Sequence, residues 1–234
     1  MFGFIQNAQD TRVAMTIKEL EQRLAGLFGA NVAVCLHRGA SADAVLFPEE
    51  EAFIANAVQK RRLEFAAGRD CARKALVKLG GSPAAIGAAA DRSPIWPAGF
   101  VGSISHTDAV CGAIAARAVD YKGLGFDIES AAPLPDELMP LLCSQGEREH
   151  FGTLPNFNVP EWSKIAFCAK EAFYKCQYPL TRQVLDFRKI SIRFPFQGDG
   201  QGTFLTQTET GGSIMSVSGF WLAHGAEIYA GCAC

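Results

Sequence analysis

Two stretches of the chain place carboxylates where they could hold a divalent cation. In GFDIES, Asp127 and Glu129 stand two residues apart in a segment that reads as a strand. Because side chains alternate across a strand, both carboxylates leave the same face, whereas Ile128 points the other way into the core. Two like charges that close repel each other unless a cation lies between them. Such hard oxygen ligands suit Mg²⁺, or alternatively Mn²⁺, although a solvated strand end would show the same pattern.

The second stretch, FCAKEAFYK, carries Glu171 in an apolar setting, with Lys175 four residues further on. At that spacing the two side chains share one face of a helix. An ordinary surface salt bridge has the same spacing, so this stretch by itself does not identify a site. Taken together, the two stretches predict a metal site built from Asp127, Glu129 and Glu171.

A basic segment, KRRLEFAAGRDCARKAL, precedes the acidic stretches and could bind phosphate. Arg62, Arg69 and Arg73 follow one another at intervals of seven and four residues, which places them along one stripe of a helix. Arg61 and Arg69 are eight residues apart and also lie nearly on one face. The planar fork of arginine matches phosphate in a bidentate manner, while a solvated basic face is the alternative reading.

The segment DRSPIWPAGFVGSISHTDAV offers further phosphate contacts. Gly99 and Gly102 permit close approach to the backbone, and Ser105 and His106 place donors at the end of a strand. A histidine there could donate to a phosphate oxygen, and a nearby anion would raise its pKa. His106 could equally cap a turn. The chain contains neither GxxxxGK[ST] nor GxGxxG, so a P-loop or Rossmann site has no support.

Helices and strands must bring these segments together. The spacing of apolar residues predicts four helical regions, at 16–28, 49–79 (one long helix or two joined ones), 137–151 and 161–177. The last of these should end before Pro179, and 87–100 should be a loop. Apolar runs predict eight strands, at 32–37, 101–104, 110–117, 122–129, 189–194, 203–206, 214–222 and 226–232. Each half therefore reads as helix followed by several strands.

Composition narrows the class of protein. The 234 residues are 49% hydrophobic, which is ample for a large core, and the net charge of −2 argues against a whole-surface nucleic-acid binder. No stretch approaches the roughly 20 apolar residues of a membrane span, and no signal peptide is apparent. The eight cysteines stand mostly in apolar patterns, which favours reduced thiols and a cytoplasmic location.

These stretches, in this order, resemble the 4′-phosphopantetheinyl transferase superfamily, and most closely its larger, single-chain branch. The resembling segments are RRLEFAAGRDCAR (61–73), RSPIWPAGFVGSISH (92–106), GFDIE (125–129) and WSKIAFCAKEAFYK (162–175). The resemblance implies an α+β fold with pseudo-symmetry, made of two similar halves at 1–120 and 121–234. Each half would pack helices on a small antiparallel sheet, with the active site between the halves of a monomer.

The resemblance also implies a function. Such an enzyme transfers the 4′-phosphopantetheine group of coenzyme A to a serine of an acyl or peptidyl carrier protein and releases adenosine 3′,5′-bisphosphate. It would serve siderophore, polyketide, peptide or fatty-acid synthesis. The alternatives are a non-catalytic module that binds coenzyme A or a nucleotide, and a metal-dependent nucleotide hydrolase or phosphotransferase.

Residue roles follow from the same resemblance. It assigns Mg²⁺ binding to three carboxylates, Asp127, Glu129 and Glu171. It assigns the phosphates of coenzyme A to six residues, Arg61, Arg69, Arg92, Ser105, His106 and Lys175, with Arg62 competing for the place of Arg61. The catalytic set is Glu171, Lys175 and Asp127, in which Glu171 could deprotonate the carrier serine. Three aromatic residues could border the carrier surface: Phe151, Phe157 and Trp162.

Overall fold

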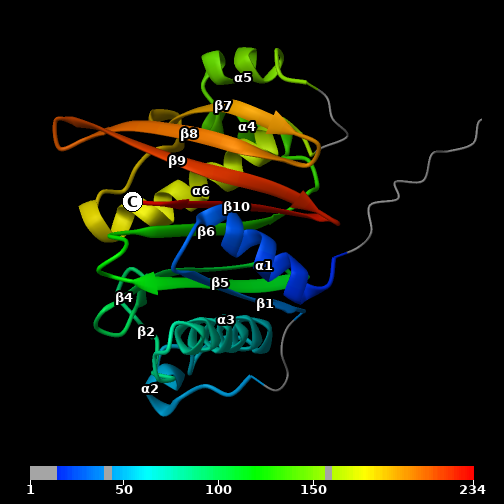
Figure 1. Ribbon diagram of the computed structural model, residues 1–234. Helices are drawn as coiled ribbons and strands as arrows, with labels where there is room; N and C mark the ends of the chain where they lie inside the picture. Colours follow the sequence, from blue (N-terminus) through cyan, green and yellow to red (C-terminus); the bar gives the residue numbers. More distant parts are fainter. Residues whose placement is uncertain (1–14, 40–43, 156–159) are drawn as a thin grey trace, which may run out of the picture.

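Two antiparallel sheets form the centre of the computed structural model, which describes residues 15–39, 44–155 and 160–234 (Figure 1). The first sheet has three strands in the order β1 (Val32–Arg38), β5 (Val110–Arg117) and β4 (Phe100–His106). The second has five strands in the order β6 (Leu124–Ser130), β10 (Glu227–Ala233), β9 (Ser213–His224), β8 (Gln201–Thr210) and β7 (Ser191–Gly198). The α+β class predicted from the sequence is confirmed.

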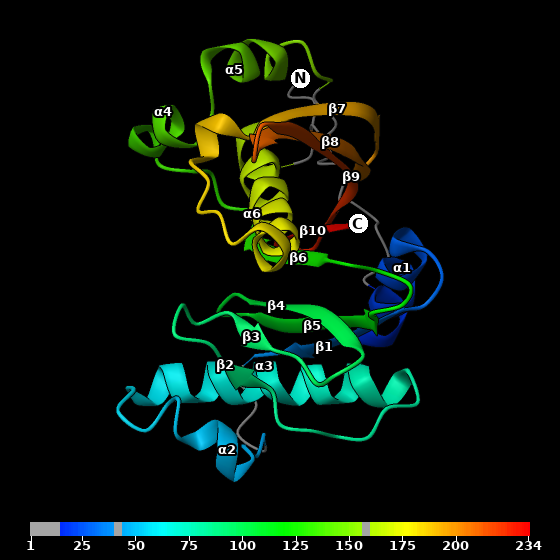
Figure 2. The ribbon, with the colours of Figure 1, turned by 90° about the vertical axis from the view of Figure 1, so that its left-hand side faces the viewer.

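Helices cover both sheets. The N-terminal region contributes α1 (Ile17–Phe28), α2 (Pro48–Glu51) and α3 (Gln59–Lys78). The remaining helices are η1 (Asp136–Leu138), α4 (Met139–Leu142), α5 (Gln145–Phe151), α6 (Trp162–Thr181) and η2 (Phe187–Lys189). In Figure 2, α3 lies under the first sheet, and α6 lies against the second sheet on the side of β6 and β10. The long helices α3 and α6 therefore cover different sheets, with α3 at one end of the molecule and α6 near its middle.

Two predicted elements differ from the structure. The region 87–100, expected to be a loop, contains a small hairpin in which β2 (Gly87–Ala88) pairs with β3 (Pro94–Ile95). The helix expected to end before Pro179 continues to Thr181, where Arg182 caps it in the left-handed conformation. A proline in the final turn removes one hydrogen bond and crowds the carbonyl one turn before it, which weakens the helix, but α6 ends only two residues later.

Apolar side chains fill the space between these layers. One cluster lies between the sheets and includes Leu24 of α1, Val34 of β1 and Phe126 of β6. A second lies between α3 and the first sheet, and a third between α6 and the second sheet. All eight cysteines are free thiols, and Cys234 is the one that is exposed. Reduced, mainly buried cysteines agree with the expectation drawn from their apolar surroundings.

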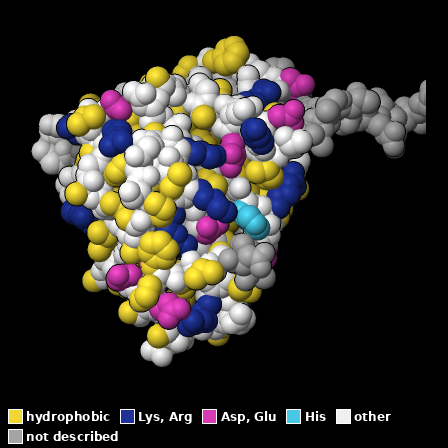
Figure 3. Space-filling model, turned by 60° about the horizontal axis from the view of Figure 1, so that its bottom comes forward, with side chains coloured by type: hydrophobic (Ala, Val, Ile, Leu, Met, Phe, Trp, Pro, Cys, Tyr) yellow, Lys and Arg dark blue, Asp and Glu magenta, His cyan; other side chains and the backbone are white. Residues whose placement is uncertain are grey.

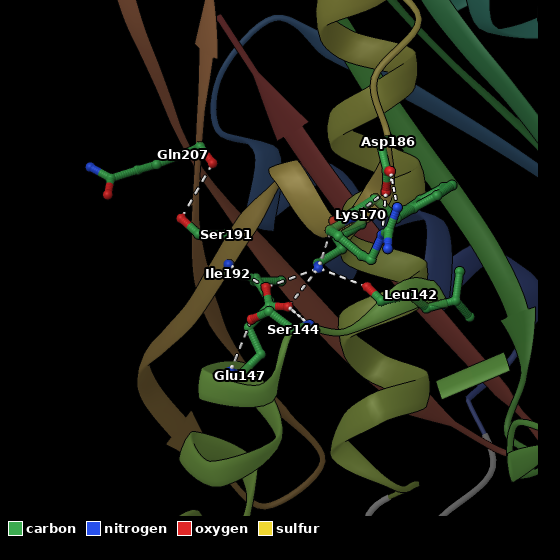
Figure 4. A network of polar contacts seen from close by, with 10 residues as sticks. Leu142, Ser144, Glu147, Lys170, Asp186, Ser191, Ile192 and Gln207 are labelled. Carbon is green, nitrogen blue, oxygen red and sulfur yellow. Dashed lines mark hydrogen bonds and ion pairs between the residues drawn. The ribbon is translucent and has the colours of Figure 1, made fainter. Parts of the chain in front are cut away.

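A buried ion pair connects α6 to the elements around it (Figure 4). Lys170 is fully buried, and its Nζ donates to the Glu147 carboxylate of α5 at 2.9 Å and to the carbonyl oxygens of Leu142 and Phe187. Glu147 in turn accepts from the backbone N–H groups of Ser144 and Ile192. The pair is thus fully hydrogen-bonded, as a buried charge requires, and holds α6 in place.

Among residues 15–39, 44–155 and 160–234, no helix is both long enough and apolar enough to cross a membrane.

Candidate active site

The candidate site depends on an unusually close contact between β6 and α6. Gly125 faces α6, and a Cβ built there would overlap the carbonyl oxygen of Ala172. Only glycine allows the strand to approach the helix backbone so closely. Asp127 and Glu129 follow at two-residue steps on the same face of β6, so their carboxylates also face α6. The alternation expected from the sequence therefore directs both side chains toward the helix that carries Glu171.

Asp127 lies at the centre of a polar cluster. It is buried, and its Oδ1 accepts from Lys175 Nζ at 2.6 Å and from Ser105 Oγ at 2.8 Å. Lys175 Nζ also donates to Ser105 Oγ at 3.1 Å, which closes a triangle of hydrogen bonds. The other carboxylate oxygen, Oδ2, is buried and has no hydrogen-bond partner among the described residues. A buried oxygen of this kind is costly unless a ligand or cation satisfies it.

The same serine joins the two sheets. Ser105 Oγ accepts from the backbone N–H of Ile128, and Ser103 Oγ bonds both the N–H and the carbonyl of Phe126. Strands β4 and β6 therefore meet through serine hydroxyls at the edges of their sheets. This arrangement places Ser105 within reach of the acidic face of β6.

Glu171 is the carboxylate without a counter-ion. It is half-buried, one turn before Lys175 on α6, and it makes no ion pair or hydrogen bond with any residue that the structure describes. Burial raises the pKa of Glu171, and the negative charges of Asp127 and Glu129 raise it further, against the opposing effect of Lys175. A carboxylate with a raised pKa accepts a proton more readily, which suits a general base.

Lys175 remains charged in this setting. Burial alone would lower its pKa, but the charge and hydrogen bond of Asp127, together with Glu171, raise the pKa above its usual value. The ammonium group is therefore a permanent positive charge beside two carboxylates. Such a group can stabilise negative charge on a phosphate without changing its own protonation state.

Lys164, which was not among the residues predicted from the sequence, pairs with Glu129. Lys164 Nζ lies 2.6 Å from Glu129 Oε2, and the lysine side chain is almost fully buried. Lys164, Glu171 and Lys175 are separated by seven and four residues, so the three lie on one stripe of α6. That spacing was available in the sequence and could have identified Lys164. Because of this lysine, Glu129 is already neutralised in the structure.

A cleft of about 730 Å³ opens beside this cluster, between the first sheet and α6. Its walls include Arg92, Ser103, Lys122, Glu171, Lys175 and Tyr178. Thus one cavity is lined by three of the residues predicted from the sequence: Arg92, Glu171 and Lys175. Gly102 also borders the cleft, but the Trp96 ring occupies the space beside it, so this glycine serves packing.

Two other predicted residues lie together at the end of β4. Arg61 Nη1 donates to His106 Nε2 at 3.0 Å, and Glu64 lies beside both. Burial lowers the pKa of His106, Glu64 opposes this effect, and the charges of Arg61 and Lys175 add to it. With its pKa lowered, His106 is neutral near pH 7. The sequence had predicted the opposite direction, a raised pKa beside a bound anion. His106 and Glu64 border a separate hollow next to Lys60. Basic and acidic side chains are intermixed over the face of the molecule that Figure 3 shows.

The other three arginines of α3 bond to groups of the protein itself. Arg69 is buried, and it donates to the carbonyl oxygens of Ile86 and Gly87. Arg73 is also buried and forms an ion pair with Glu50. Arg62 donates to carbonyl oxygens of the segment that joins α2 to α3. The stripe expected to be a basic surface is therefore largely a set of structural contacts, and a phosphate-binding role for Arg69 stays a prediction.

The other two predicted metal ligands lie near Asp127, but the three carboxylates do not form a closed metal site. Within the described ranges, no group of three or more histidine, cysteine, aspartate or glutamate side chains is arranged to hold a metal ion. The donor chemistry nevertheless suits a hard divalent cation, because Asp127 Oδ2 has no partner and Glu171 has no counter-ion. Glu129 is the least available of the three, since Lys164 already neutralises it.

Of the predicted carrier-facing aromatic residues, Phe151 and Trp162 line a hollow of about 400 Å³ beside Arg148. Phe151 is buried, and Trp162 packs against Phe194 and Trp221. Phe157 lies outside the described residues.

A carboxylate, a lysine and a serine beside a cleft between the first sheet and α6 form a site suited to phosphate chemistry. Residues 49–116 match the family model of the 4′-phosphopantetheinyl transferase N-terminal domain, and residues 123–219 match that of the 4′-phosphopantetheinyl transferase superfamily. The chain belongs to the 4′-phosphopantetheinyl transferase superfamily and is an enzyme of that class.

Three relatives illustrate the similarity. The chain is 38% identical to 4′-phosphopantetheinyl transferase Npt of Nocardia iowensis over 75% of its own length and 83% of the relative's. It is 43% identical to 4′-phosphopantetheinyl transferase Svp of Streptomyces mobaraensis, over 63% and 61% of the two chains. It is 36% identical to Enterobactin synthase component D of Salmonella typhi, over 51% and 50%.

Proposed function

We propose that this chain transfers the 4′-phosphopantetheine group of coenzyme A to a serine of an acyl or peptidyl carrier protein. The observation that carries the proposal is Glu171, a carboxylate with a raised pKa, at the wall of a cleft beside the Asp127–Lys175 pair. Membership of the superfamily supports the reaction, and the cleft has room for a nucleotide-sized substrate.

Each residue has a role in this proposal. Glu171 accepts the proton of the carrier serine as its hydroxyl oxygen attacks the pantetheine-side phosphorus. The bond from this phosphorus to the oxygen shared with the second phosphate breaks, and adenosine 3′,5′-bisphosphate leaves. Lys175 stabilises the charge on the departing phosphate, and Ser105 keeps Lys175 and Asp127 in register. Arg92, at the cleft wall, binds the 3′-phosphate.

The positions of Arg61 and His106 suggest a second set of phosphate contacts. The two side chains already touch, whereas the donors of Arg62 go to backbone carbonyls, which favours Arg61 over Arg62. A phosphate near His106 would raise its pKa and convert Nε2 from an acceptor into a donor. Arg69 would bind the phosphate through the guanidinium N–H groups that it does not use for its bonds to backbone carbonyls.

Divalent metal binding is part of the proposal. Asp127 and Glu171 would hold Mg²⁺ or Mn²⁺, and Glu129 would join them by giving up its ion pair with Lys164. When bound, the ion would neutralise the pyrophosphate and orient it for attack. The unpaired Asp127 Oδ2 supports this assignment.

The partner and the setting are inferred from the relatives. Their names associate this class of enzyme with phosphopantetheinyl transfer and, in one case, with enterobactin synthesis. We infer a cytoplasmic monomer that docks the carrier protein near the hollow beside Trp162 and Arg148. We also propose two halves, 1–120 and 121–234; the strands of the first sheet end at Arg117 and those of the second begin at Leu124, which supports this division.

Mass spectrometry of intact carrier proteins tests this function. Incubation with coenzyme A and Mg²⁺ should add one phosphopantetheine group to one serine, and a chelator should prevent the addition. Asp127→Ala should lose activity together with its response to Mg²⁺. Release of adenosine 3′,5′-bisphosphate without mass gain on any carrier would indicate a hydrolase. Binding of coenzyme A without turnover would indicate a non-catalytic module.

A further inference from the structure

The β2–β3 hairpin reaches across the cleft and contacts α6. Tyr178 of α6 donates its hydroxyl to Asp91 Oδ2 at 2.7 Å, and Arg182 Nη1 lies 3.5 Å from the same oxygen. Asp91 belongs to the turn between β2 and β3, on the side of the first sheet. This contact therefore joins the two walls of the cleft directly, at a distance in sequence of 87 residues.

The same aspartate also organises the hairpin turn. Its Oδ1 accepts from the Ser93 N–H at 3.0 Å and from the Ser93 hydroxyl at 2.6 Å. Arg92, between the two, has φ = 68°, a left-handed conformation that is unfavourable for a residue with a side chain. Strain of this kind persists only where the surroundings impose it. Here the two bonds from Ser93 to Asp91 Oδ1, which span Arg92, impose it.

The protonation states suit a permanent bond. The Ser93 hydroxyl and N–H, and then Tyr178, lower the pKa of Asp91 to about 2, so the carboxylate is charged at neutral pH. Its bond to Asp91 raises the pKa of Tyr178, so the phenol keeps the proton that it donates. The contact is thus a charge-assisted hydrogen bond, which is stronger than a bond between neutral groups.

The base of the hairpin is anchored separately. Arg69 donates to the carbonyl oxygens of Ile86 and Gly87, and Glu50 accepts from the N–H of Ile86. The base therefore keeps its place on α3 whatever happens at the tip. The shorter bond from Tyr178, with Arg182 beside it, sets where the tip, with Arg92, stands relative to α6.

We propose that Tyr178, acting through Asp91, is a positioning residue that holds Arg92 at the cleft wall for an anionic phosphate at the nucleoside end of the substrate. The proposal rests on the proposed function for the identity of that substrate, coenzyme A. Tyr178 then affects the affinity for the substrate, whereas the transfer step depends on Glu171 and Lys175.

Tyr178→Phe tests the proposal, with Tyr174→Phe as the matched control. The two rings stack 5.5 Å apart on successive turns of α6 and both line the cleft, but the Tyr174 hydroxyl bonds to no described residue. Each variant loses one hydroxyl and keeps its ring, so both should fold. Calorimetry should show coenzyme A binding weakened about tenfold in Tyr178→Phe, the typical effect of losing a hydrogen bond to a charged group, and unchanged in Tyr174→Phe.

Two further measurements separate positioning from a general structural effect. In an Arg92→Ala background, Tyr178→Phe should have no additional effect on affinity, because the group that it positions is gone. With 3′-dephospho-coenzyme A as the probe, Tyr178→Phe and the wild type should bind equally. In the transfer reaction, KM for coenzyme A should rise in Tyr178→Phe while kcat stays the same.

Equal affinity of Tyr178→Phe and Tyr174→Phe for coenzyme A would overturn the proposal, as would an undiminished effect of Tyr178→Phe in the Arg92→Ala background. Wild-type binding of coenzyme A without transfer would refute the proposed function and leave this comparison valid. A wild-type chain that does not bind coenzyme A would overturn both.

Discussion

Replacing Lys170 with methionine separates the structural lysine of the AKEAFYK segment from the residues that could act on substrate. The Lys170 side chain is completely buried, and its three hydrogen bonds go to Glu147, Leu142 and Phe187. Methionine fills a similar volume but leaves the buried Glu147 carboxylate without a counter-ion. Breaking a buried pair in this way costs about 3–5 kcal/mol of the free energy of unfolding.

Thermal and urea denaturation measure this cost. For a chain of this size each kcal/mol lowers Tm by about 2–4 °C, so Lys170→Met should melt about 6–20 °C below the wild type. The double variant Lys170→Met, Glu147→Met should recover much of the loss, because both charges are then removed. Lys175→Met is the matched control. Its side chain is partly exposed and Asp127 keeps the hydrogen bond from Ser105, so it should abolish transfer with a smaller change in Tm.

A loss of less than about 1 kcal/mol in Lys170→Met would refute this reasoning, because it would mean that water or another cation reaches Glu147. An unchanged stability of the double variant relative to Lys170→Met would also contradict it.

Three further outcomes are expected. Gly125→Ala should lower the free energy of unfolding by at least about 2 kcal/mol in urea denaturation, because its methyl group would overlap the Ala172 carbonyl. Glu171→Ala should abolish carrier modification in a mass-spectrometric assay while its circular dichroism matches the wild type, and wild-type rates would rule out both of its proposed roles. NMR titration should place the pKa of His106 below 6.5. Because the folded state then binds this proton less readily than the unfolded chain, the contribution of His106 to stability should fall as the pH drops below 6.5.

Local patterns predicted the main elements and the directions of the acidic side chains. Two-residue spacing placed Asp127 and Glu129 on one face of a strand, and four-residue spacing placed Glu171 and Lys175 on one face of a helix. Such periodicities depend on backbone geometry alone, so they can be read without knowledge of the tertiary fold.

Contacts between distant segments could not be predicted in this way. The bond from Lys175 to Asp127 joins residues 48 apart, and no spacing indicates that it forms. The helical stripe of α3 showed that Arg69 and Arg73 share a face, but it did not show that this face is buried against Glu50 and the backbone of Ile86. The hairpin at 87–95 was missed because its strands are two residues long and hold no apolar alternation.

The contact between Gly125 and Ala172 has a consequence for how this enzyme can change over generations. The separation between the acidic strand and the helix with Glu171 is set where two main chains touch, and no side chain acts as a spacer there. Substitutions among the surrounding core residues can therefore accumulate without moving the reactive groups apart. A single added methyl group at Gly125 would push the two main chains, and with them the reactive groups, apart.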